Sequence, residues 1–151
     1  MDYYTSTTFR ESLADLMKKS KDGYMTVVKD VCETLKNMPD NILRDTNDRV
    51  YQYPEYRVVK LRVINSGQKL SKSNGFRLIY WVSLLHDSVV LMRIYPKRGP
   101  LSAVELQNSE YTRLQNEVFS ENKECKLHQV DITNDLAELS QNACLPGATA
   151  C

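Results

Sequence analysis

Apolar residues recur at helical spacing in two stretches near the start of the chain. In residues 9–17 they fall on one helical face, and Thr8 with Glu11 forms a capping box that predicts the start of this helix. In residues 24–35 they recur at the same spacing, before a stop at Pro39. Because the break between the two patterns is short, we expect two antiparallel helices lying side by side.

The apolar pattern changes to an alternation with period two in the middle of the chain. Residues 57–64, 76–83 and 88–95 place apolar side chains at alternating positions, which predicts three strands. His86 and Asp87 lie in a short turn between the last two strands, which should therefore pair as an antiparallel hairpin.

Weaker signals complete the predicted order of elements. Residues 2–7 are rich in Tyr and Thr and predict a first strand, whereas residues 39–55 are polar and predict a loop. A second capping box, Ser102 with Glu105, predicts a helix that continues to about Phe119. The order indicates an α+β fold, in which an N-terminal helix pair packs on a small, mainly antiparallel four-stranded sheet, plus a C-terminal helix.

Composition is ordinary for a soluble globular domain, with 151 residues, 42% hydrophobic and 26% charged. No apolar stretch approaches the roughly 18 residues of a transmembrane helix, and the first residues do not resemble a secretory signal, so no membrane contact is expected. The four cysteines lack CxxC spacing, which favours free thiols in a cytoplasmic protein. Cys125 and His128 alone offer too few ligands for structural zinc, so neither a metal nor a cofactor is expected.

Charge is distributed unevenly behind a formal net charge of +1. Residues 57–98 carry nine Lys or Arg and a single acidic residue, Asp87, whereas the segments on both sides are net negative. A basic block of this kind suits a polyanion such as nucleic acid if its charges share one face. The alternative is a solvated face whose cations pair with the acidic flanks.

Three short segments carry a family resemblance. Residues 59–62 (VKLR), 72–80 (KSNGFRLIY) and 94–98 (IYPKR) resemble, in this order, segments of the RelE/ParE superfamily of bacterial toxins, especially its HigB-like branch. The resemblance covers about residues 1–118. We therefore expect a RelE-like toxin domain over residues 1–120, followed by an extension, 121–151, that is partly helical or disordered.

The resemblance implies the toxin component of a type II toxin–antitoxin system. Many members are mRNA interferases, ribosome-dependent endoribonucleases that inhibit translation by cutting messenger RNA through attack of the ribose 2′-OH, without a metal. The implied partners are a cognate antitoxin protein, the ribosome and mRNA. Two alternatives remain: a ParE-like gyrase poison, or a non-catalytic RNA-binding relative.

Candidate catalytic residues follow from strand parity and from the resemblance. Lys60 and Arg62 should emerge on one face, with Arg77 beside them and Lys97 and Arg98 after the end of the neighbouring strand. Crowding by cations disfavours a charged lysine, so Lys60 is expected to act as a general base, and Arg77 and Arg98 suit a phosphate clamp. The resemblance implies catalytic roles for three residues, which are Lys60, Arg77 and Arg98.

RNA binding without chemistry is expected for the remaining cations and for the single tryptophan. Lys69 and Lys72 lie in a basic Gly/Ser-containing connection suited to phosphate contacts, and Trp81 shares the Arg77 face and suits base stacking. The full expected RNA-binding set is Arg62, Lys69, Lys72, Lys97 and Trp81.

Two departures from the family pattern bear on catalysis. Val58 stands where nuclease members have a second catalytic lysine. Nuclease members also place a catalytic tyrosine after the last strand, whereas residues 99–110 contain none and Tyr111 falls inside the predicted helix. The sequence therefore leaves open whether nuclease activity is retained.

Overall fold

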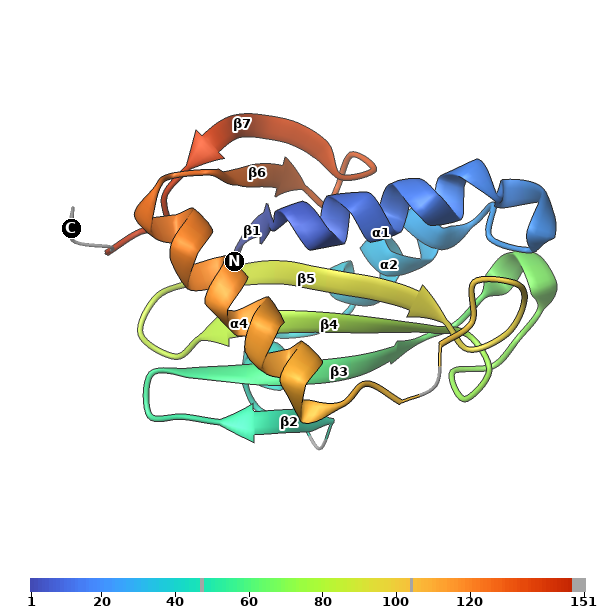
Figure 1. Ribbon diagram of the computed structural model, residues 1–151, viewed down its shortest axis with the longest axis horizontal. Helices are drawn as coiled ribbons and strands as arrows, with labels where there is room; N and C mark the ends of the chain where they lie inside the picture. The colour runs from blue at the N-terminus through green and yellow to red at the C-terminus, as the bar shows by residue number, and fades with distance from the viewer. Residues whose placement is uncertain (47, 104, 148–151) are drawn as a thin grey trace.

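One mixed β-sheet organises the chain (Figure 1). The computed structural model describes residues 1–46, 48–103 and 105–147. The strands are β1 (Asp2–Thr5), β2 (Arg49–Gln52), β3 (Tyr56–Val63), β4 (Phe76–Ser83), β5 (Ser88–Pro96), β6 (Leu127–Asp131) and β7 (Ala137–Ala143). The helices are α1 (Thr7–Lys18), α2 (Val27–Lys36), the short α3 (Asp40–Arg44) and α4 (Asn108–Lys123), with 3-10 turns η1 (Ser20–Asp22) and η2 (Ser66–Gln68).

The strands are arranged in the order β2-β3-β4-β5-β1-β6-β7. β1 runs parallel to β5, and every other neighbouring pair is antiparallel. Since β1 lies inside the sheet, its Tyr3 and Tyr4 are buried on opposite faces, as alternation along a strand requires.

The predicted sheet of four strands with a helix pair and one C-terminal helix is wrong. The described part of the chain is α+β, but it has a seven-stranded mixed sheet and three main helices, α1, α2 and α4. The missed strands carry weak local signals: β2 is four residues long, and β7 is exposed along almost its whole length. β2 is held by pairing with β3, β6 by pairing with β1, and β7 by pairing with β6. A local sequence pattern does not indicate such pairing between distant segments.

Two hydrophobic cores lie on the two faces of the sheet. The core beneath α1 and α2 includes Phe9, Val31 and Leu78, and the core beneath α4 includes Ile79, Leu114 and Val118. β4 is buried along all eight residues because both of its faces are covered. The apolar run of β4, broken only by Arg77 and Ser83, is typical of a strand that is covered on both faces.

Carboxylates from α4 cap the start of α1. Ser6 accepts a hydrogen bond from the Phe9 amide, so α1 begins before the predicted Thr8 capping box. Glu121 and Glu117 accept from the amides of Thr7 and Thr8, at 3.0 Å each. Anionic groups stabilise the free N–H groups and the positive dipole end of a helix, so part of the acidic C-terminal charge serves the fold.

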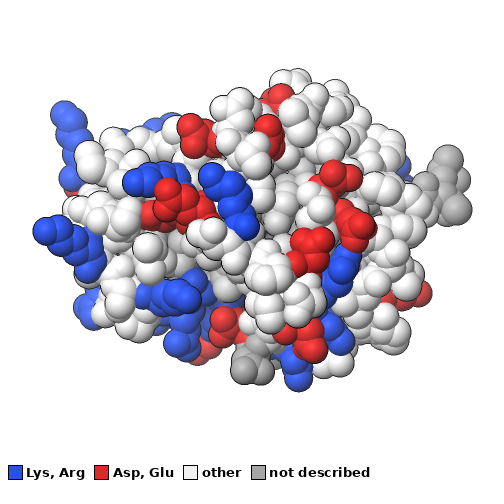
Figure 2. Space-filling view, turned by 180° about the vertical axis from the view of Figure 1, so that it is seen from behind, with Lys and Arg blue, Asp and Glu red and all other residues white. Residues whose placement is uncertain are grey.

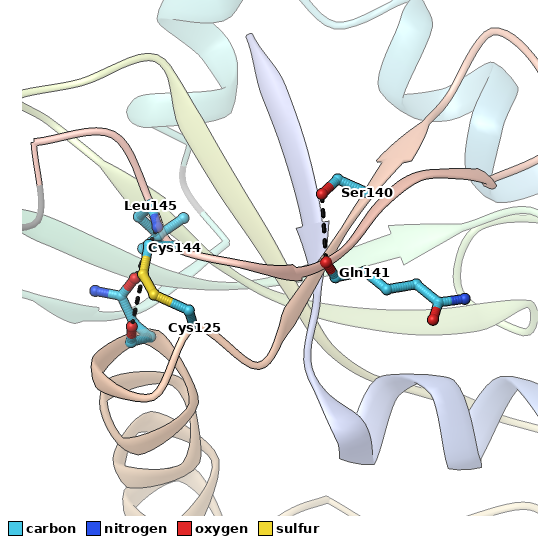
Figure 3. Close-up of a disulfide and its surroundings, with 6 residues drawn as sticks. Cys125, Ser140, Gln141, Cys144 and Leu145 are labelled. Atoms are coloured by element: carbon cyan, nitrogen blue, oxygen red, sulfur yellow. Dashed lines mark hydrogen bonds between the residues drawn. A yellow bond between two sulfur atoms is a disulfide. The ribbon is translucent and has the colours of Figure 1, made fainter.

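A disulfide closes the C-terminal hairpin. Cys125 follows α4 and is bonded to Cys144 after β7, as Figure 3 shows. The prediction of free thiols is wrong for this pair; Cys32 is free and buried, and Cys151 lies outside the described residues. Next to the bond, the Leu145 amide donates to the Asn122 side chain at 2.7 Å. The disulfide therefore ties the end of the hairpin to the last turn of α4.

Candidate nucleic-acid interface

Cationic side chains from adjacent strands share the sheet face that α4 covers. Arg62 of β3 lies directly opposite Arg77 of β4, and Lys60 lies opposite Ile79. Arg77 is in turn opposite Tyr95 of β5. The structure thus places Lys60, Arg62 and Arg77 together, as strand parity predicted.

A groove of about 740 Å³ opens beside Lys60 and Arg62, between β3, the start of β2 and the segment that leads into α4, and Arg77 is not among its lining residues. Arg62 is exposed in it, whereas Lys60 is partly covered. We call this the cationic groove. Its charged and polar lining comprises Asp48, Arg49, Lys60, Arg62, Glu105, Gln107, Asn108 and Tyr111.

Glu105 occupies the groove beside Lys60. The predicted capping box at Ser102 is wrong, because α4 begins only at Asn108 and Glu105 lies in the preceding loop. Its carboxylate accepts a hydrogen bond from Lys60 Nζ at 2.8 Å, and this bond and the lysine charge lower the pKa of Glu105. The general base role for Lys60 assumed only cationic neighbours, whereas its direct charged contact is a carboxylate.

Arg77 is built into the fold more deeply than predicted. Its side chain donates to the carbonyls of Lys72 and Ser73 at 2.9 and 3.0 Å, and to its neighbour Phe76 at 3.3 Å. Burial, and secondarily the charge of Arg62, lowers the pKa of Arg77. These bonds leave two of the five guanidinium N–H groups for a ligand. Arg77 therefore holds the 72–76 loop against the end of the sheet.

The remaining predicted cations lie in loops at the same end of the sheet. Lys69 and Lys72 are exposed in the β3–β4 connection, and Lys97 and Arg98 follow β5. The Arg98 side chain donates to Asn74 Oδ1 at 2.8 and 3.1 Å rather than into the cationic groove. The segment after β5 is thus hydrogen-bonded to the β3–β4 connection.

A close approach at Gly75 fixes the geometry of this end. A Cβ at Gly75 would lie 2.1 Å from the Val63 carbonyl oxygen, so any larger residue would displace the β3–β4 connection. The Lys97 amide donates to the Gly75 carbonyl at 2.8 Å, which anchors the segment after β5 to the same point.

Trp81 lies away from the cations. It pairs with Val58 of β3, four residues along β4 from Arg77, and its ring is 8% exposed in the core beneath α4. Val58 is fully buried in the same core. Tyr111 is also buried, so its position in a helix reflects packing, and burial raises its pKa to about 12.

Ion pairs neutralise part of the basic block. Arg57, Lys60 and Arg93 pair with Asp45, Glu105 and Glu110, each acidic partner coming from a flanking segment. Within residues 1–46, 48–103 and 105–147, no ion pair involves Arg62, Lys69, Lys72 or Lys97. The expected pairing with the acidic flanks is therefore found for three of the nine cations of residues 57–98.

Basic side chains also gather on the opposite face. Figure 2, seen from behind, shows Lys and Arg concentrated toward the end of the molecule where the turn after α1 and the β3–β4 connection lie. The exposed Lys18, Lys19 and Lys21 come from α1 and that turn. This end of the molecule is thus the more basic one.

The acidic residues of the groove, Asp48 and Glu105, were not predicted from the sequence. Asp48 and Glu105 both lie in segments without regular structure, and the signal available for Glu105 suggested a helix cap instead. In the described residues no cluster of three His, Cys, Asp or Glu side chains could hold a metal ion, and no helix is both long and apolar enough to cross a bilayer.

Comparison of the chain with family models, curated proteins and solved structures gives no match. The resemblance to the RelE/ParE superfamily stays a prediction that rests on the three short segments.

Proposed function

We propose that this protein is a bacterial toxin of the type II toxin–antitoxin class that acts on RNA in the cytoplasm. In this proposal it is a ribosome-dependent mRNA endoribonuclease, held inactive by a cognate antitoxin protein. The cationic groove is its substrate site, and the ribose 2′-OH is the nucleophile.

One observation carries the proposal: Arg62 and Arg77 lie directly opposite each other on adjacent strands. Like charges in such a pair are destabilising, and burial of one of them adds to the cost. An anion between the two arginines would remove this repulsion. Lys60, two residues from Arg62 on the same strand face, adds a third cation, as the equatorial oxygens of a phosphodiester require.

Roles can be assigned from these contacts. Arg62 is exposed and suits direct contact with the scissile phosphate, whereas Arg77 supports the adjacent loop and can offer its remaining N–H groups. Once the phosphate displaces Glu105, the 2′ oxygen attacks the adjacent phosphorus as the P–O5′ bond breaks, which leaves a 2′,3′-cyclic phosphate and a 5′-hydroxyl end. Lys60 accepts the 2′ proton, and solvent water protonates the leaving 5′ oxygen. Displacement of Glu105 by the phosphate is easy, since exposed ion pairs contribute roughly 0–1 kcal/mol.

A second function, RNA binding without cleavage, is favoured by a specific observation. Val58 is fully buried in the core beneath α4, so no charged group stands at the position where nuclease members of the resembled family have a lysine. Lys60 is already paired and Arg77 is largely committed to loop carbonyls. A gyrase poison would likewise need no convergence of catalytic cations.

The test is expression without antitoxin, combined with primer extension on a translated message in an extract without added metal. We expect growth arrest and cleavage by the wild type. Arg62→Ala should reduce the cleavage rate about 10²–10³-fold, and Lys60→Ala about 10²–10⁴-fold. Lys126→Ala is the matched control, because Lys126 also pairs with an exposed glutamate but lies after α4.

Each other outcome has a distinct meaning. Arrest with intact message and loss of DNA supercoiling would indicate a gyrase poison. RNA binding without cleavage would favour the second function. The absence of both growth arrest and RNA binding would show that the proposal is wrong.

A further inference from the structure

Aromatic rings extend from the cationic groove along the side of the sheet that α4 covers. The edge of Tyr111, in the groove, meets Tyr51 with ring centroids 5.7 Å apart. Tyr51 stacks on Tyr53 at 6.4 Å, and Tyr53 stacks on Tyr56 at 4.6 Å. Tyr56 then meets Phe119 of α4 at 5.5 Å. We call Tyr51, Tyr53, Tyr56 and Phe119 the aromatic track.

The aromatic track is partly exposed to solvent, unlike the buried core beside it. Tyr53 is 39% exposed and Phe119 is 43% exposed, although both rings touch the same partner, Tyr56. Packing of the β2–β3 hairpin against α4 is already secured by hydrogen bonds, from Tyr51 to Asn108 at 2.7 Å and from Tyr56 to Gln115 at 3.2 Å. Contiguous exposed apolar rings commonly mark a binding surface.

A pocket of about 330 Å³ lies at the far end of the aromatic track. Its walls include Tyr56, Trp81 and Phe119, and Ser88 also lines it. Trp81 Nε1 and Ser88 Oγ are buried and have no hydrogen-bond partner. Such groups are rare in folded proteins. Because Trp81 and Ser88 both line the pocket, a ligand with acceptor atoms is one kind of partner for them. A nucleobase is a flat ring that can stack on the aromatic walls, and its nitrogen and oxygen atoms can accept hydrogen bonds from Trp81 Nε1 and Ser88 Oγ.

The spacing along α4 matches a short stretch of single strand. Asn108 lines the cationic groove, and Phe119 lines the pocket. These residues are eleven positions apart on one helix, which corresponds to about 16 Å. A chain of a few nucleotides spans this distance, and its bases would meet the aromatic track on the way.

We infer that the aromatic track and its pocket bind the bases of single-stranded RNA whose phosphates lie in the cationic groove. The inference rests on the proposed function and specifies its substrate as unpaired RNA. Stacking on aromatic side chains needs bases that are free of a helix, and it tolerates any sequence because every base has a π-face.

Trp81 is the single tryptophan of the chain, so its fluorescence reports on the pocket. The probes are a ten-nucleotide oligouridylate, an abasic ribose-phosphate oligomer of equal length, and an RNA duplex. We expect the oligouridylate alone to change Trp81 fluorescence. Phe119→Leu and Tyr53→Leu keep an apolar side chain but remove the ring, and each should weaken oligouridylate binding about tenfold.

Two comparisons separate base stacking from charge and from misfolding. Phe119→Tyr keeps a ring and should bind like the wild type, and Leu139→Ala, at another exposed apolar site, on β7, is the control. Binding of the abasic oligomer should not respond to Phe119→Leu. Arg62→Ala should instead weaken the binding of both oligomers and lower the salt slope by about 0.7.

Failure of the inference can be told apart from failure of the proposed function. The inference would be overturned if the wild type, Phe119→Leu and Tyr53→Leu bound oligouridylate equally and Arg62→Ala bound it less tightly. The proposed role of the cationic groove in binding phosphates would then still stand. In that case the rings serve the fold or a protein partner. Absence of any RNA binding by the folded wild type would overturn both.

Discussion

Opening the Cys125–Cys144 disulfide should destabilise the protein by an amount that the loop length sets. The bonded residues are 19 positions apart. In the chain-entropy treatment, a closed loop of about this length contributes about 3.3 kcal/mol at 25 °C by restricting the unfolded chain. Native contacts next to the bond, such as that of Leu145 with Asn122, do not require the sulfur atoms. The reduced protein should therefore remain folded, with a smaller free energy of unfolding.

The measurement is thermal and urea unfolding of oxidised protein, reduced protein and the Cys125→Ser/Cys144→Ser double variant. For a chain of this size we expect Tm to fall by about 7–13 °C on reduction, at about 2–4 °C per kcal/mol. The double variant should match the reduced wild type and should not respond to reductant. Cys32 should not interfere, because burial raises the pKa of its thiol to about 11.

Equal Tm values for oxidised and reduced protein would refute this reasoning. So would complete unfolding on reduction, because it would mean that the hairpin depends on the bond for its native contacts. A loss of about 3.3 kcal/mol is smaller than the roughly 5–15 kcal/mol that stabilises a typical domain. A protein acting in a reducing cytoplasm, as we propose, would therefore remain folded with these cysteines reduced.

Two further predictions concern the groove and its tyrosine. Glu105→Gln should strengthen oligouridylate binding up to about fivefold, because it removes the carboxylate that competes with phosphate for Lys60. Glu124→Gln, at another exposed ion pair, is the control and should not change the affinity. Weaker binding of Glu105→Gln would contradict this prediction. Burial raises the pKa of Tyr111 from 10.0 to about 12, so the neutral phenol stabilises the fold fully below pH 10 and this stabilisation is lost as the pH rises from about 10 to 12. Tyr111→Phe should therefore show a smaller drop in Tm between pH 8 and pH 11, and an unchanged drop would count against the burial argument.

Segments whose apolar pattern reports burial directly were predictable from the sequence. The bounds predicted for β4 are those observed, and β3 differs by one residue at each end. The same alternation predicted that Lys60 and Arg62 share a face, which the structure shows. In these central strands the local pattern and the tertiary packing demand the same conformation.

Features that depend on distant partners were not predictable. β6 and β7 contain few apolar residues, and β6 is held by its pairing with β1 at the other end of the chain. The disulfide requires two cysteines to meet across a hairpin that the sequence did not indicate. Glu105 was misassigned because a capping box is a local signal, whereas its ion pair with Lys60 spans 45 residues. The shared face of Lys60, Arg62 and Arg77 was thus predicted, whereas the carboxylate beside Lys60 was missed.

The net charge of a segment overstates how much of it a polyanion can use. Of the nine cations in residues 57–98, Arg57, Lys60 and Arg93 have acidic partners, and Arg77 is buried against carbonyls. The five others, Arg62, Lys69, Lys72, Lys97 and Arg98, are exposed. Contacts from these five would give a salt slope of about 3.5 for single-stranded RNA, and Lys60 would raise it to about 4.2 once Glu105 is displaced, whereas nine free charges would give about 6.3. Affinity for RNA then needs a second source that salt does not screen, and the aromatic track supplies one of the right chemical kind beside the cationic groove.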